Sequence, residues 1–223
     1  MGRPGRRAGQ LSSVAVQWKM ERSQPARLHP IIEYRDHLPM TTLTIYLVRH
    51  ATPDWSRTDI PYHIPPGPPL TEQGRAEAEA LGAFLHQAGV RQIFTSPLER
   101  CHHTAQIAGA LAGAPVETLP ELGEWSPGET MQAMRERTWP AFEQACLACA
   151  ETGPVALVTH GGPVLVLLEA LGMPPEVSRE HRIYDHRNPL PPAGAWLAQR
   201  NGQGEAWALE LVFTPQAVPA EGR

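Results

Sequence analysis

The sequence predicts an α/β fold, a three-layer α/β/α sandwich with a mostly parallel central sheet. Short runs of β-branched and apolar residues alternate with longer amphipathic segments, the order expected for strands joined by crossover helices. The chain has 223 residues, of which 42% are hydrophobic, and this suits one sizeable domain with a buried core. The pattern contains no internal repeat and no signal of a second domain.

The first expected elements are a strand, a loop, a helix and a second strand. Leu43–Val48 is the first β-branched, apolar run. The loop that follows ends in residues 61–69, where five prolines exclude regular structure. Thr71 is a suitable N-cap for a helix whose apolar residues recur at helical spacing, and Gly89 ends that helix. Arg91–Thr95 is the next short strand.

The following helix carries the clearest start signal in the chain. Ser96 is placed as its N-cap, Pro97 at its first position and Glu99 three residues after the cap. Gly113 ends this helix, and a strand over Val116–Leu119 follows.

The remaining elements alternate in the same way. They are a helix from Met131 to Cys149 bent at Pro140, a strand at Val155–Thr159, a helix at Val164–Leu171, and strands at Ala195–Gln199 and Ala206–Phe213 joined by a turn at Asn201-Gly202.

Composition divides the chain into three parts. Residues 1–40 contain seven Lys/Arg and three Asp/Glu, so the remainder contains twelve Lys/Arg and twenty Asp/Glu. The whole chain has a net charge of −4. These forty residues lack a sustained helical or strand period, so they are predicted to be a disordered leader or a start assigned too early, with a basic targeting or binding arm as the alternative. Residues 41–214 are predicted to form the single domain, and residues 215–223 a loose tail.

Composition also excludes several classes of protein. The acidic domain argues against a nucleic-acid binder. No apolar run has membrane-spanning length or a signal-peptide layout. The three cysteines, Cys101, Cys146 and Cys149, are too few for a disulfide framework, so a cytoplasmic location is expected. None of the three is followed by arginine at the spacing of a cysteine-based phosphatase.

Two histidines and two arginines lie close to the carboxyl ends of predicted strands. His50 comes directly after the first strand beside Arg49, His160 comes after the strand at 155–159, and Arg100 lies in the opening turns of a helix. Because ligands of open α/β sheets bind at the carboxyl ends of the strands, these four side chains are expected to meet there. The Gly161-Gly162-Pro163 segment that follows His160 leaves backbone N–H groups free near the start of the next helix, and such groups can bind an anion. The set is typical of a phosphoryl site.

At this point the motifs LVRHAT, PLTEQGRAEA, TSPLERCHHTA, ELGEW and LVTHGG resemble those of the histidine phosphatase superfamily, in the same order. The resemblance implies a phosphoglycerate mutase-like fold. It implies that His50 is the nucleophile that becomes phosphorylated, that Arg49, Arg100 and His160 contact phosphate, and that Glu124 is the proton donor. Ser56 stands where the family often has a phosphate-binding Asn, with Arg57 beside it as a possible substitute, and Ala51 stands where Gly is more usual.

The function expected from this resemblance is hydrolysis of a small phosphorylated substrate through a phosphohistidine, without metal or cofactor. Only 36 residues separate Glu124 from His160 (160 minus 124), a short insertion that favours a phosphatase over a phosphoglycerate mutase-type transferase. Three alternatives stay open: a mutase, a non-catalytic phosphate-binding protein, and a metal site built from His50, Asp54, Glu124 and His160. Among the loop carboxylates, Glu121 is the second choice for the proton donor.

Overall fold

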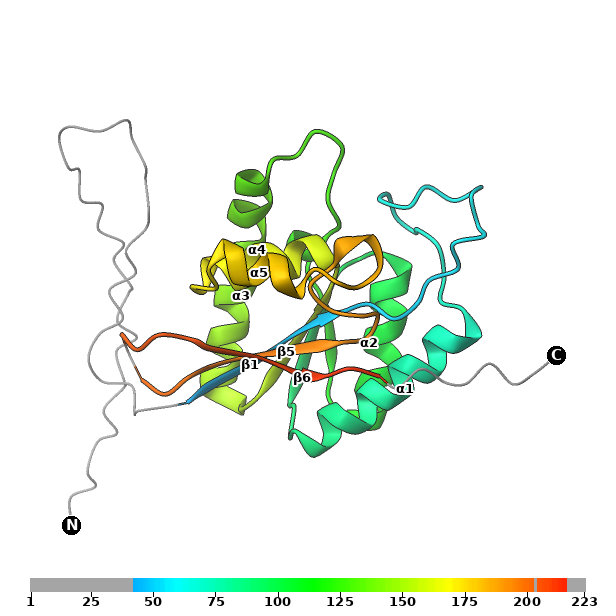
Figure 1. Cartoon of the computed structure of the whole chain (residues 1–223). Helices are drawn as coiled ribbons and strands as arrows, with labels where there is room; N and C mark the ends of the chain where they lie inside the picture. The colour runs from blue at the N-terminus through cyan, green and yellow to red at the C-terminus, as the bar shows by residue number, and fades with distance from the viewer. Residues whose placement is uncertain (1–41, 203, 216–223) are drawn as a thin grey trace, which may run out of the picture. The chain divides into compact units, whose positions relative to one another are not determined.

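The structure is a computed structural model that describes residues 42–202 and 204–215. Six strands form one sheet in the order β3-β2-β4-β1-β5-β6, with β1 (Leu43–Arg49), drawn in blue, near its middle (Figure 1). The other strands are β2 (Gln92–Thr95), β3 (Val116–Thr118), β4 (Val155–Thr159), β5 (Ala195–Arg200) and β6 (Ala208–Phe213).

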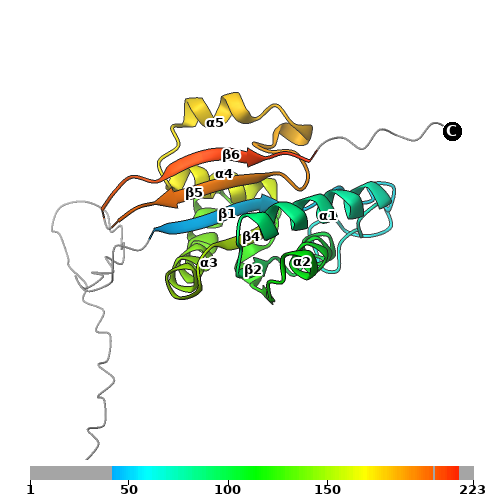
Figure 2. The ribbon, with the colours of Figure 1, turned by 90° about the horizontal axis from the view of Figure 1, so that it is seen from below.

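The sheet is mixed, and only one of its six strands is reversed. β1 pairs in parallel with β4, β4 with β2, and β2 with β3, whereas β5 is antiparallel to both β1 and β6. Figure 2 shows β6, β5, β1 and β4 side by side. The predicted α/β class with a mostly parallel sheet is therefore confirmed, and β5 and β6 form the expected hairpin.

Alternate residues of each strand face opposite layers of helices, which is why the central strands are mostly apolar. On one face, Ile45, Leu157 and Trp196 pack in a cluster with α3 (Met131–Thr152) and α4 (Gly161–Ala170). On the other face, Val48 and Val158 pack with α1 (Glu72–Gln87) and α2 (Glu99–Ala112). The helices thus cover both faces, as a three-layer sandwich requires.

The N-caps of α1 and α2 can be compared with the capping residues predicted from the sequence. Thr71 caps α1 as predicted, because its hydroxyl accepts a hydrogen bond from the Gly74 N–H at 3.0 Å. The prediction for Ser96 was wrong: α2 begins at Glu99 and its N-cap is Leu98, which provides no side-chain bond. Ser96 instead faces His160 across the sheet edge, at 2.9 Å. Gly113 ends α2 in the left-handed conformation, as expected.

Several short elements were not predicted or start elsewhere. α4 begins at Gly161, three residues before the expected Val164, so the glycines after β4 form its first turn. The structure adds α5 (Pro175–His181) and the 3₁₀ turns η1 (Pro120–Leu122) and η2 (Asp185–Arg187). Pro140 lies inside α3, which continues to Thr152.

The predictions for the ends of the chain concern residues 1–40 and 215–223. The first range lies outside the described residues, as does nearly all of the second. Within the described residues, the structure contains no helix with the length and apolar character needed to cross a membrane.

Candidate active site

His50 and His160 lie side by side because the strands that carry them are parallel neighbours. Arg49 pairs in register with Thr159, so the next residue of each strand leaves the sheet at the same edge. The His50 N–H donates to the Thr159 carbonyl at 2.8 Å. The two imidazole rings are buried with centroids 5.2 Å apart. The structure therefore brings together two histidines that are 110 residues apart in sequence.

His50 lines the cavity, and its ring nitrogen Nε2 lies 3.4 Å from the Tyr62 hydroxyl. Its Nδ1 lies 2.8 Å from the Ala51 carbonyl, and since a carbonyl oxygen only accepts, Nδ1 carries the proton and Nε2 keeps its lone pair. Burial, followed by the nearby charges of Arg100 and Arg49, holds the pKa of His50 well below its ordinary value. The imidazole is therefore neutral at physiological pH.

Arg100, in the first turn of α2, is the cation at the base of the site, and it is fully buried. Its Nη1 donates to the Tyr62 carbonyl at 2.7 Å and its Nη2 to His160 Nδ1 at 3.1 Å. The guanidinium also lies under the Tyr62 ring, 3.8 Å from its centroid. Its Nε has no hydrogen-bond partner although it is buried. A buried, incompletely satisfied guanidinium is suited to hold a phosphoryl oxygen.

His160 is fixed as a neutral imidazole by its two neighbours. Because Arg100 can only donate, Nδ1 accepts, and the opposite nitrogen, Nε2, carries the proton that is donated to Ser96 Oγ at 2.9 Å. Burial and the charge of Arg100 hold the pKa of His160 well below its ordinary value. Cys101 lies beside this ring, and burial raises the pKa of its thiol to about 12, so it is a thiol rather than a nucleophilic thiolate.

Arg49 is held by a carboxylate from a different part of the chain. Its Nη1 and Nη2 donate to the two oxygens of Asp185 at 2.6 and 2.7 Å. Burial raises the pKa of Asp185, but the hydrogen bonds and charge of Arg49 outweigh it, and the net shift is downward. Asp185 is 40% exposed while Arg49 is almost completely buried. The pair therefore orients a buried cation from the solvent side.

Replacing Asp185 with asparagine is expected to lower the free energy of unfolding by about 1–2 kcal/mol at neutral pH, between the values for exposed and buried ion pairs. Because the folded-state pKa of Asp185 is depressed, this stability is complete above its unfolded pKa and is lost as the pH falls through the folded value. Urea denaturation of both proteins from pH 7 to pH 3 measures the difference. A gap that is absent at pH 7, or that persists unchanged at pH 3, contradicts this account.

Three glutamates lie in η1 and in the loop from η1 to α3, and of these only Glu124 contacts the cluster within the described residues. Glu124 Oε2 lies 3.4 Å from both Arg100 Nη2 and His160 Nδ1. Glu129 is instead paired with Arg137 at 2.8 Å, and Arg137 also donates to the backbone carbonyls of Glu121 and Gly123. Arg137 therefore fixes the loop that presents Glu124.

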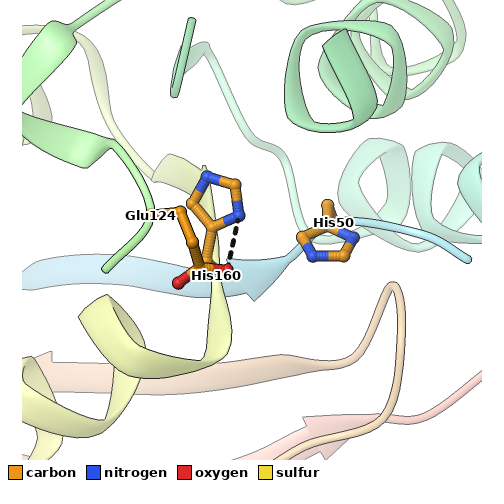
Figure 3. A group of neighbouring side chains, drawn as sticks. All are labelled: His50, Glu124 and His160. Carbon is orange, nitrogen blue, oxygen red and sulfur yellow. Dashed lines mark ion pairs between the residues drawn. The ribbon is translucent and has the colours of Figure 1, made fainter. Parts of the chain in front are cut away.

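Figure 3 shows Glu124 and His160 in contact and His50 across from them. Because His160 is neutral, the charged partner of the Glu124 carboxylate is Arg100 rather than the imidazole.

A cavity of about 340 Å³ lies over these groups. The residues that line it are Arg49, His50, Trp55, Tyr62, Glu124, Gly161, Gly162, His186 and Asn188. The first turn of a helix leaves its N–H groups without backbone partners, so Gly161 and Gly162 at the start of α4 offer donors to a bound anion. A side chain at Gly161 would collide with the Asn188 side chain unless the latter moved.

A family model described as histidine phosphatase superfamily (branch 1) matches residues 45–129 and 125–188, which include every residue of this cluster. The chain belongs to this superfamily. The predicted family membership and phosphoglycerate mutase-like fold are thus confirmed.

Two curated relatives illustrate the similarity in sequence. The protein named "Probable phosphoglycerate mutase GpmB" of Erwinia tasmaniensis is 25% identical over 201 residues, which cover 72% of this chain and 93% of that protein. The adenosylcobalamin/alpha-ribazole phosphatase of Escherichia coli is 31% identical over 87 residues, 39% of this chain and 42% of that protein.

Solved structures show the same fold. A mycobacterial glucosyl-3-phosphoglycerate phosphatase superimposes with a TM-score of 0.63 at 19% identity, covering 78% of this chain and all of that one. A phosphoglycerate mutase from Bacillus anthracis gives 0.60 at 16% identity, covering 77% and 93%. The superfamily fold is therefore shared by proteins named as phosphatases and as mutases.

Two residues that the superfamily resemblance placed in the substrate site lie elsewhere. The Ser56 hydroxyl donates to Asp54, and Arg57 forms a two-bond pair with Asp59 at 2.9 Å. Ser56, Arg57 and Asp59 are exposed and Asp54 is partly buried. None of these residues lines the cavity. The expected contact of Ser56 and Arg57 with substrate has no support in this arrangement, because local turn contacts hold both side chains away.

The sequence analysis did not place three residues in the site: Ser96, Tyr62 and Asp185. Ser96 was predicted to cap a helix, whereas in the structure its hydroxyl forms a hydrogen bond with His160. Tyr62, whose hydroxyl lies 3.4 Å from His50 Nε2, belongs to the proline-rich loop 61–69, to which the sequence analysis gave no role in the site. Asp185 lies in a short 3₁₀ turn without any sequence pattern, and only the folded chain shows that it meets Arg49.

The same cluster contains the atoms for a possible metal site. One ligand atom from each of His50, Glu124 and His160 lies within 4.8 Å of the others. However, His160 Nδ1 already accepts a hydrogen bond from Arg100, and the guanidinium of Arg100 lies next to the Glu124 carboxylate. A divalent ion there would be repelled by this cation. The donor set fits a phosphoryl group better than a metal ion.

Proposed function

We propose that this protein is a metal-independent phosphatase that hydrolyses a small phosphomonoester through a phosphohistidine on His50. The observation that carries the proposal is the neutral His50, with its Nε2 lone pair unprotonated, beside two buried arginines. A neutral imidazole can attack phosphorus, and the guanidinium groups can stabilise the charge on the phosphoryl oxygens.

In the first step, the Nε2 lone pair of His50 forms the bond to phosphorus while the bond from phosphorus to the ester oxygen breaks. The developing charge lies on the three equatorial oxygens, within reach of Arg49, Arg100 and the N–H groups of Gly161 and Gly162. Glu124 transfers its proton to the leaving oxygen, which departs as an alcohol. The Tyr62 hydroxyl lies 3.4 Å from Nε2, so it borders the space that the phosphoryl group takes.

In the second step, water attacks the phosphorus of phosphohistidine and the bond to Nε2 breaks. Glu124, now a carboxylate, takes the proton from this water, so the acid is regenerated and inorganic phosphate is released. His160 contributes through Arg100, because its Nδ1 accepts from the guanidinium that holds the phosphoryl oxygens.

Removal of divalent metals is expected to leave the activity unchanged within about twofold, because each proton transfer and each charge has a side chain assigned to it. Exhaustive dialysis against a chelator, with metal content measured before and after, tests this expectation. Loss of activity that zinc restores would instead assign His50, Glu124 and His160 to a metal centre.

A mutase is the second candidate, because relatives of this chain are named phosphoglycerate mutases. Both reactions share the phosphohistidine and differ in whether water or a bound acceptor attacks it. Phosphorus NMR of the protein with 3-phosphoglycerate and with simple phosphomonoesters separates them. Release of inorganic phosphate equal to the alcohol formed supports the phosphatase; appearance of an isomeric phosphoglycerate without free phosphate supports the mutase. A protein that binds phosphate without turnover gives neither product.

A further inference from the structure

Aromatic side chains form the mouth of the cavity above the polar floor. The Trp55 ring stacks on Tyr62, with centroids 4.8 Å apart and planes at 18°, and lies 5.0 Å from His186. Tyr62 stacks in turn on the Arg100 guanidinium. The three planar groups form a column from the phosphoryl site to the surface, and Trp55 at its outer end is 45% exposed. An exposed indole at the mouth of a cavity is a surface on which a flat ring can stack.

The mouth of the cavity is poor in free positive charge. Among the described residues that line it, Arg49 is the single guanidinium, and both of its Nη atoms are bound by Asp185. Two neighbouring arginines are engaged away from the cavity lining, Arg57 by Asp59 and Arg137 by Glu129. A second anionic group on the substrate would therefore find no unpaired guanidinium among the described residues that line the cavity.

We propose that the natural substrate has an uncharged leaving group that carries an aromatic ring, and that Trp55 is the specificity-determining residue that binds this ring. The proposal rests on the proposed phosphatase function. The cavity volume of about 340 Å³ lies at the lower end of the range for small-molecule sites, which suits one phosphoryl group and one small ring system. The lack of an unpaired guanidinium in the lining disfavours leaving groups that are themselves acidic.

The test compares three phosphomonoesters of primary alcohols: benzyl phosphate, n-butyl phosphate and 4-carboxybenzyl phosphate. They have similar leaving groups at the reacting oxygen and differ in the ring and in one negative charge. We expect kcat/KM for benzyl phosphate to exceed that for each of the other two by about tenfold or more, since stacking of one ring on an aromatic side chain has effects of this size.

Variants at Trp55 then assign the preference to this residue. Trp55→Ala is expected to remove the preference of benzyl over butyl phosphate, mainly through KM, while Trp55→Phe keeps part of it. Trp207→Ala is the matched control, because this indole packs against Arg200 and Phe142, neither of which lines the cavity. It should leave the benzyl to butyl ratio unchanged. Melting temperatures of all variants report on folding separately from specificity.

The possible failures can be told apart. If none of the three esters is hydrolysed and no phosphoprotein forms, the phosphatase function itself is wrong. If the esters are hydrolysed equally well, if the carboxylated ester is preferred, or if Trp55→Ala lowers kcat/KM for all three by the same factor, the phosphatase stands and the inference about its substrate is overturned. A higher kcat/KM for glucose 6-phosphate than for benzyl phosphate overturns it as well.

Discussion

Replacing His50 with alanine is expected to abolish turnover of every phosphomonoester, with kcat falling by at least about 10⁴-fold. Among the described residues, the variant lacks the ring nitrogen that the site offers to phosphorus with an unprotonated lone pair, since His160 Nδ1 is occupied by Arg100 and its Nε2 faces Ser96. Loss of a nucleophile in a preorganised site has effects of this size. Initial rates with benzyl phosphate measure the loss.

The intermediate gives a second, independent readout of the same substitution. In the wild-type protein, rapid quenching during turnover should trap an acid-labile phosphoryl group on His50. Mass spectrometry of peptides prepared at alkaline pH detects this group. The His50→Ala variant should show none. His86→Ala, which changes an exposed histidine near the end of α1, serves as the control and should keep both rate and label.

Folding of the His50 variant must be separated from its chemistry, because the side chain is buried. Inorganic phosphate should still bind the variant through Arg49, Arg100 and the first turn of α4, and this binding should raise its melting temperature. Label that persists at another residue in His50→Ala, with turnover retained, would show that a different side chain is the nucleophile.

The outline of the site was predictable because it depends on strand order rather than on loops. His50 and His160 each follow a strongly apolar strand, and parallel neighbours bring their carboxyl ends to one edge whatever the connections between them. Arg100 was placed at the same edge by the strand that precedes α2. The superfamily motifs then supplied Glu124, which the loop composition alone could not separate from Glu121 and Glu129.

The errors arose where a local rule competed with a tertiary contact. Ser96-Pro97-Leu98-Glu99 has the composition of a helix start, and Thr71 shows that such a signal can be correct in the same chain. Ser96 fails because its hydroxyl bonds His160 from another strand, and the chain turns for two more residues before α2 begins. The ion pair of Asp185 with Arg49 spans 136 residues, and a polar loop residue carries no periodic signal that would reveal such a contact.

Replacing Glu124 with glutamine is expected to lower kcat for alkyl phosphomonoesters by about 10²–10⁴-fold, the usual contribution of general acid catalysis. Glutamine keeps the shape of the side chain and can still accept from Arg100, but it has no proton to donate to the leaving oxygen. With 4-nitrophenyl phosphate, whose leaving group departs as a stable anion, the first step needs no proton, and phosphohistidine formation should be nearly as fast as in the original protein. Single-turnover kinetics with the two substrates measure this contrast.

Glu121 and Glu129 provide the controls for this assignment. Glu129 is paired with Arg137, so Glu129→Gln loosens the loop and is expected to lower activity by a similar, modest factor with both substrates. Glu121→Gln should have little effect, because Arg137 binds the backbone of this residue rather than its carboxylate. A greater loss in Glu121→Gln than in Glu124→Gln would move the proton donor to Glu121. An equal loss with alkyl and 4-nitrophenyl esters in Glu124→Gln would mean that Glu124 positions Arg100 and His160 but donates no proton.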